Sequence, residues 1–122
     1  MTAAIYWWEA ELQALARTHM GSDLARIDHL GSYACRNVNS TECGRRSQHA
    51  TANALDIAGF RFADGRTASV LDDWSADSPA GRFLAAAHDA ACGYFNTVLG
   101  PAYNDLHANH FHLDLGRARI CR

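Results

Sequence analysis

Residues 54–71 read ALDIAGFRFADGRTASVL, and this stretch contains the strongest indication of the fold. Two apolar runs, residues 54–62 and 66–71, flank the dipeptide Asp64-Gly65. Asp-Gly between apolar runs is a strong hairpin signal, because both residues tolerate the backbone angles that a tight turn requires. The stretch therefore predicts a strand, a tight turn and a second strand, with Asp56 near the start of the first strand.

A further strand is predicted later in the chain, in the run HANHFHLDL at residues 107–115. Successive side chains of a strand point to opposite faces of a sheet. One face would carry the apolar side chains of Phe111, Leu113 and Leu115, and the other would carry His110, His112 and Asp114. The alternation therefore predicts a strand with one face in the core and one face available for chemistry.

Helices are predicted on either side of these strands. Apolar residues recur at helical spacing over residues 3–19, and Gly21 follows as a stop. A second helix is predicted over residues 79–96, because Ser78-Pro79 is typical of an N-cap followed by proline at the first helical position. With a further short strand near residues 32–36, we expect one α+β domain over residues 1–122, in which helices flank a small antiparallel sheet.

Composition excludes several classes of function. The chain has 122 residues, of which 48% are hydrophobic and 20% charged, and its net charge is −2. Nucleic-acid binding rests on clustered positive charge, so we expect no nucleic-acid partner. All eleven basic residues are arginine, which excludes a lysine nucleophile. We expect neither a membrane span nor a signal peptide, because no apolar stretch approaches about 20 residues and the start carries no basic leader.

Four cysteines, at positions 35, 43, 92 and 121, lack the short spacing of a zinc knuckle. Two disulfides are the preferred interpretation. Of the three possible pairings we favour Cys35 with Cys43, closing a polar loop, and Cys92 with Cys121, tying the last residues to a helix. The alternative is four thiols in a reducing compartment. Disulfides would place the protein in a periplasm or outside the cell.

Histidines and one aspartate suggest a metal site. His110 and His112 leave the same face of a predicted strand, while His49 ends a loop and Asp56 lies on the strand that follows. Two histidines and one aspartate make three ligands. Three protein ligands with an open fourth position are typical of a catalytic zinc rather than a structural one.

The pattern Ser-x-His-x-x-Ala-x-Ala-x-Asp at residues 47–56, followed by His110-x-His112, resembles the signature of the LAS metallopeptidases. This group includes dipeptidases, peptidoglycan endopeptidases and the hedgehog signalling domain. The segments GSYACRN, DIAGF, ACGYF, VLGPAYN and HANHFHLD resemble bacterial extensin-like C-terminal domains more closely. This second resemblance covers nearly the whole chain.

The resemblance implies a LAS/hedgehog-like fold with one zinc ion in a cleft, held by His49, Asp56 and His112. It also places His107 and His110 beside the metal. Many relatives carry a glutamate three residues before the last histidine ligand, where this chain has Asn109. An amide cannot act as a general base, so His110 is the expected substitute.

Three further residues receive roles. Arg36 resembles the arginine that such peptidases direct at the developing oxyanion, Ser47 would fix its loop by hydrogen bonding, and Tyr33 is a candidate for substrate contact. The expected function is a zinc-dependent hydrolase of peptidoglycan peptides that uses a zinc-bound water. Two alternatives remain: a zinc-stabilised binding module without hydrolysis, and a secreted cell-wall toxin with the same chemistry and a partner immunity protein.

Overall fold

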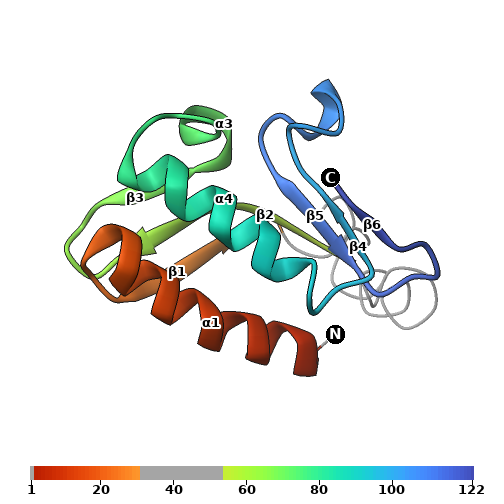
Figure 1. Cartoon of the computed structure of the whole chain (residues 1–122), viewed down its shortest axis with the longest axis horizontal. Helices are drawn as coiled ribbons and strands as arrows, with labels where there is room; N and C mark the ends of the chain where they lie inside the picture. Colours follow the sequence, from red (N-terminus) through yellow and green to blue (C-terminus); the bar gives the residue numbers. More distant parts are fainter. Residues whose placement is uncertain (1, 31–53) are drawn as a thin grey trace, which may run out of the picture.

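The computed structural model describes residues 2–30 and 54–122 of the chain (Figure 1). The elements in chain order are α1 (Thr2–Met20), β1 (Leu24–His29), β2 (Ala54–Phe62), β3 (Thr67–Ser69), α3 (Val70–Asp73), α4 (Pro79–Ala91), β4 (Thr97–Leu99), the 3-10 helix η2 (Asp105–His107), β5 (Phe111–Asp114) and β6 (Ile120–Cys121). The expectation of an α+β fold is therefore confirmed.

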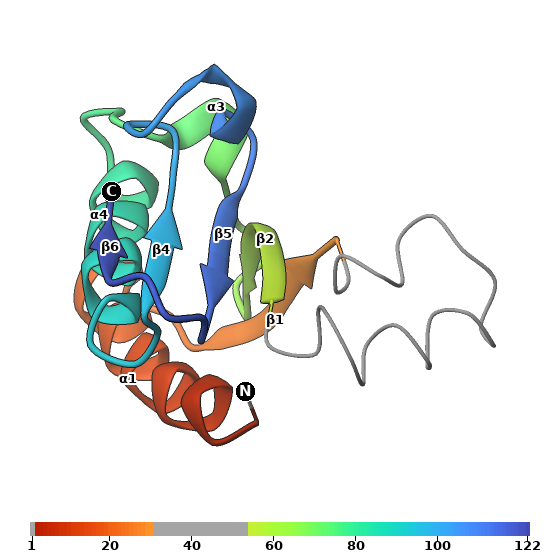
Figure 2. The same ribbon diagram turned by 90° about the vertical axis from the view of Figure 1, so that its right-hand side faces the viewer.

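The strands form one six-stranded sheet in the order β1-β2-β5-β4-β6, with β3 paired to β2. β1, β3 and β5 all run antiparallel to β2, and β4 runs antiparallel to β5. The prediction of a purely antiparallel sheet is wrong at one edge, because β6 pairs with β4 in parallel. The chain reaches this arrangement by crossing from the end of β5 back to the far side of β4 (Figure 2).

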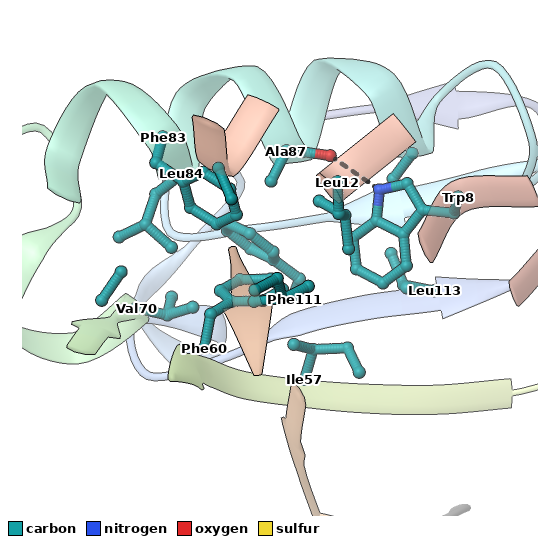
Figure 3. Packing of buried hydrophobic residues seen from close by; sticks show 14 of the residues in the cluster. Trp8, Leu12, Ile57, Phe60, Val70, Phe83, Leu84, Ala87, Phe111 and Leu113 are labelled. Carbon is teal, nitrogen blue, oxygen red and sulfur yellow. Dashed lines mark hydrogen bonds between the residues drawn. The ribbon is translucent and has the colours of Figure 1, made fainter. Parts of the chain in front are cut away.

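The two long helices, α1 and α4, pack against each other and cover one face of the sheet (Figures 1 and 2). Between helices and sheet lies a core of buried apolar side chains (Figure 3). Its largest fully buried members include Trp8 and Leu12 of α1, Phe83 and Leu84 of α4, and Ile57, Phe60, Phe111 and Leu113 of the sheet. The indole N–H of Trp8 donates to the carbonyl oxygen of Ala87 at 3.0 Å, so the one polar atom of this ring is satisfied inside the core.

The predicted hairpin is present as β2 and β3, with Gly65 in the turn at a φ of +91°. Its second strand is shorter than the predicted 66–71, because the chain leaves the sheet after Ser69. The side-chain oxygen of Ser69 accepts a hydrogen bond from the backbone N–H of Asp72, which caps the short helix α3. A register irregularity between Asp28 and His29 of β1 lies opposite the segment 57–59 of β2.

The first predicted helix matches α1 within one residue at each end. The second begins at Pro79 as predicted, with Ser78 as its N-cap, but it ends at Ala91 and not at residue 96. The backbone N–H groups of both Tyr94 and Phe95 donate to the carbonyl of Ala91, so the chain tightens into a turn that leads into β4. The strand predicted near residues 32–36 lies outside the described residues.

The predicted disulfide between Cys92 and Cys121 is present and joins the end of α4 to β6. Cys35 and Cys43 lie outside the described residues. None of the helices in the described part of the chain has the length and apolar content needed to cross a membrane.

Candidate metal centre

Asp56 and His112 are cross-strand neighbours on the face of the sheet opposite the helices. Asp56 lies in β2 directly across from His112 in β5, and their neighbours in sequence, Ile57 and Phe111, are paired and buried in the core. The strand alternation therefore sends the carboxylate and the imidazole to the same side, as the sequence predicts. The Asp56 carboxylate is only 1% exposed, and its Oδ1 lies 3.0 Å from Nδ1 of His112.

His112 also contacts a second carboxylate. Its Nε2 lies 2.8 Å from Oδ2 of Asp114, whose other oxygen accepts the backbone N–H of Gly116 at 2.9 Å. Both nitrogens donate together only when the ring carries both protons. The hydrogen bond with Asp56, supported by the one with Asp114, raises the pKa of His112 above its usual value despite the opposing effect of burial.

His110 also lies near the Asp56 carboxylate, and its closest approach is to the same oxygen that His112 contacts. Its Nε2 is 4.0 Å from Oδ1 of Asp56, and its Nδ1–H donates to the side-chain oxygen of Asn109 at 2.8 Å. A neutral imidazole that donates from Nδ1 has its lone pair on Nε2. The contact with Asn109 therefore favours the tautomer whose basic nitrogen faces Asp56.

His107 completes a group of three imidazoles. Its ring centre lies 5.0 Å from that of His110 and 6.3 Å from that of His112. Its Nδ1–H donates to Oδ1 of Asn104 at 2.7 Å, so this ring has the same arrangement as the pair of His110 and Asn109. Burial and then the positive charge of His112 lower the pKa of His107, which favours its neutral form.

One pair of donor atoms on this face can be compared with the geometry of a zinc ion. Zinc ligands in proteins are commonly imidazole nitrogens and carboxylate oxygens at about 2.0–2.2 Å, so two ligand atoms on one tetrahedral ion lie about 3.4 Å apart. The 3.0 Å between Asp56 Oδ1 and His112 Nδ1 is close to that separation. A nearly fully buried carboxylate also needs a positive partner, which a cation or a protonated imidazole supplies.

Several residues assigned from the sequence lie outside the described part of the chain. They are His49, Arg36, Tyr33 and Ser47. The structure describes the other four assigned residues and brings them together at one place. They are Asp56, His107, His110 and His112.

A groove of about 640 Å³ lies elsewhere in the molecule, between α1 and the β1–β2 pair. Its lining includes Trp8, Ile27 and Ile57 but none of the clustered histidines and not Asp56. Because Ile57 and Asp56 point to opposite faces of β2, the groove and the candidate centre are on opposite sides of the sheet.

The family described as extensin-like protein C-terminus matches residues 1–122, the full length of the chain. The chain belongs to this family. No curated protein and no solved structure matches this extensin-like domain.

Two contacts in the extensin-like domain were not predicted from the sequence. Asn104 and Asn109 each accept a hydrogen bond from a histidine Nδ1, and neither was assigned a role. Asn104 lies three residues before His107, at the start of the turn that η2 forms, and this spacing lets its side chain reach the histidine ring. Asp114, in contrast, shares the strand face with His112, and that alternation already suggests a carboxylate that orients a ligand histidine.

Proposed function

We propose that this extensin-like domain is a zinc-dependent hydrolase of peptidoglycan peptides. One observation carries the proposal: a carboxylate that is 1% exposed, Asp56, has the nitrogen of His112 at 3.0 Å and that of His110 at 4.0 Å. Asp56 and His112 lie on the face of the sheet opposite the core, and His110 lies one residue before β5. They suit a metal and a proton acceptor side by side.

Asp56 and His112 would hold the zinc, together with His49, which the resemblance to LAS metallopeptidases assigns as the third ligand. When bound, zinc lowers the pKa of a coordinated water and polarises a carbonyl group. Asp114 would keep the His112 ring in place through its hydrogen bond to Nε2, a task that carboxylates commonly perform for ligand histidines.

His110 would accept the proton of the attacking water at Nε2. Asn109 supports this role because it accepts the Nδ1–H of His110 and so leaves the lone pair on the nitrogen nearest Asp56. His110 would then return the proton to the leaving amine, as general acid–base catalysis requires. His107, whose lowered pKa favours the neutral form, is the candidate to relay that proton to solvent.

Arg36 would stabilise negative charge on the carbonyl oxygen, a role that rests on the resemblance alone. Tyr33 would contact the peptide, and Ser47 would fix its loop by hydrogen bonding at the edge of the peptide site. The Cys92–Cys121 disulfide supports a periplasmic or extracellular place of action, since disulfides persist in oxidising compartments.

The test uses purified protein and cross-linked muropeptides, analysed by mass spectrometry for newly formed amino termini. We expect cleavage that ortho-phenanthroline abolishes, that its non-chelating meta isomer leaves intact, and that added zinc restores. Elemental analysis should find one zinc ion per chain. Cleavage that survives complete removal of metal would contradict the proposal.

Asn109 also favours a second candidate function. Many LAS relatives have a glutamate base at this position, and an amide cannot replace its chemistry. A domain that binds zinc and cell-wall peptides without cutting them would keep the ligands and lack the base. Stoichiometric zinc and saturable muropeptide binding, with no cleavage of any peptide tested, would favour this binding module. A secreted toxin with an immunity partner would instead share the hydrolytic chemistry.

A further inference from the structure

A second group of metal-binding side chains lies at the end of α4, separate from the candidate centre. His88 lies in the last turn of α4, Cys92 is the C-cap residue four positions later, and Cys121 of β6 is joined to Cys92 by the disulfide. One ligand atom from each of the three residues lies within 4.8 Å of the other two. Among the described residues this is the only such group of three with donors so close together.

His88 has a ring nitrogen that nothing satisfies. The residue is 6% exposed, and its ring packs against Trp74 and Phe111, with ring centres 5.6 Å and 5.4 Å away. Its Nδ1 lies 3.5 Å from a carboxylate oxygen of Asp89. Its Nε2 is buried and has no hydrogen-bond partner within the described part of the chain. Buried polar atoms are nearly always paired, so an unpaired imidazole nitrogen points to a missing ligand.

Both sulfur atoms are positioned by more than the bond between them. Cys92 follows the last turn of α4, and its backbone N–H donates to the carbonyl of His88. β6 is held beside β4 by two backbone hydrogen bonds, Ile120 N to Asn96 O at 2.9 Å and Arg122 N to Val98 O at 2.8 Å. Opening the disulfide therefore leaves Cys121 next to Cys92.

We propose that reduction of the Cys92–Cys121 disulfide converts this group into a site for a thiophilic divalent cation, with His88, Cys92 and Cys121 as ligands. A thiol or phosphine reductant supplies the two electrons that break the S–S bond, and each sulfur takes up one proton. The cation then displaces both protons, because thiolate and not thiol is the ligand. Zinc and cadmium suit one imidazole and two thiolates, with sulfur atoms about 3.8 Å apart on a zinc ion.

In an oxidising compartment the disulfide would prevent metal binding at this site, and in a reducing compartment the two free thiols could bind the cation. It is independent of the proposed hydrolase function, because none of its ligands belongs to the candidate centre.

The test uses cadmium, whose thiolate complexes absorb in the ultraviolet, in a Cys35→Ser/Cys43→Ser background that leaves Cys92 and Cys121 as the only cysteines. We expect no charge-transfer band from oxidised protein. After treatment with a phosphine, the band should grow and saturate at one cadmium per chain. Cadmium bound at Asp56 and His112 gives no such band, because neither ligand is a thiolate. The absorbance therefore reports binding at the cysteine site alone.

His88→Ala should lower the cadmium affinity of the reduced protein by at least about tenfold, since even outer partners of a metal ligand contribute about ten- to a hundredfold. His19→Ala, at the end of α1, is the matched control and should change nothing. The proposal is overturned if folded, reduced protein gives no band, or if the band is unaffected by His88→Ala. Loss of the far-ultraviolet circular dichroism of the chain on reduction overturns it as well, because the ligands are then not held together.

Discussion

Alternate residues of β5 face opposite sides of the sheet and have different surroundings. Phe111 and Leu113 are fully buried against the helices, whereas His112 and Asp114 lie on the other face beside Asp56. Phe111 and Leu113 are held by apolar packing in the core, whereas His112 and Asp114 are held by hydrogen bonds. One four-residue strand therefore contributes side chains both to the hydrophobic core and to the candidate centre. Substitutions on the two faces should therefore have separable effects.

The largest effect is expected on the chemical face. His112→Ala removes a proposed zinc ligand, so zinc content should fall from one per chain towards zero and muropeptide cleavage should fall to background. The far-ultraviolet circular dichroism should remain that of the folded protein, because the core face of β5 is untouched. Retention of stoichiometric zinc would mean that His112 is not a ligand.

On the core face we expect the reverse pattern. Phe111→Ala should lower the free energy of unfolding by about 3–5 kcal/mol, because it leaves a cavity against Trp74 and His88. Urea unfolding measures this loss, and zinc content at low urea should stay at one per chain. Equal losses of zinc and stability in this variant would show that the two faces are not independent.

His110→Ala separates the ligand from the proton acceptor on the chemical face. Zinc should remain bound, while turnover falls about a hundred- to ten-thousandfold, the usual contribution of general acid–base catalysis. The measurements are zinc content and steady-state kinetics, with His19→Ala as a matched histidine control. Loss of zinc would instead identify His110 as the ligand, with the roles of the two histidines reversed.

The smallest effect is expected for Asp114→Asn, which keeps the size of the side chain and removes its charge. Zinc affinity should fall about ten- to a hundredfold, as is typical when the partner of a ligand histidine is lost. Competition with a metal indicator measures the affinity. An unchanged affinity would show that Asp114 orients the turn at Gly116 rather than His112.

The sequence predicted the parts of this fold that depend on local periodicity. The hairpin at Asp64-Gly65, helix α1 and the alternation in β5 were all found where the pattern indicates them. The parallel pairing of β6 was not predicted, because it depends on a contact between segments distant in sequence. The early end of α4 was not predicted, because the apolar pattern continues through Tyr94 and Phe95 although the backbone turns after Ala91. Within the candidate centre, the shared face of Asp56 and His112 follows from strand geometry. The amide partners of His107 and His110 depend on turns that no periodicity describes.

The disulfide between α4 and β6 has a consequence for the solubility of the protein. β6 is only two residues long, and it covers the outer edge of β4, which otherwise presents unpaired backbone groups. Exposed strand edges invite pairing with other chains, and short, charged edge strands discourage it. With Arg119 and Arg122 flanking it, β6 protects this edge of the sheet, and the covalent link to α4 reinforces the two backbone hydrogen bonds that hold β6 beside β4.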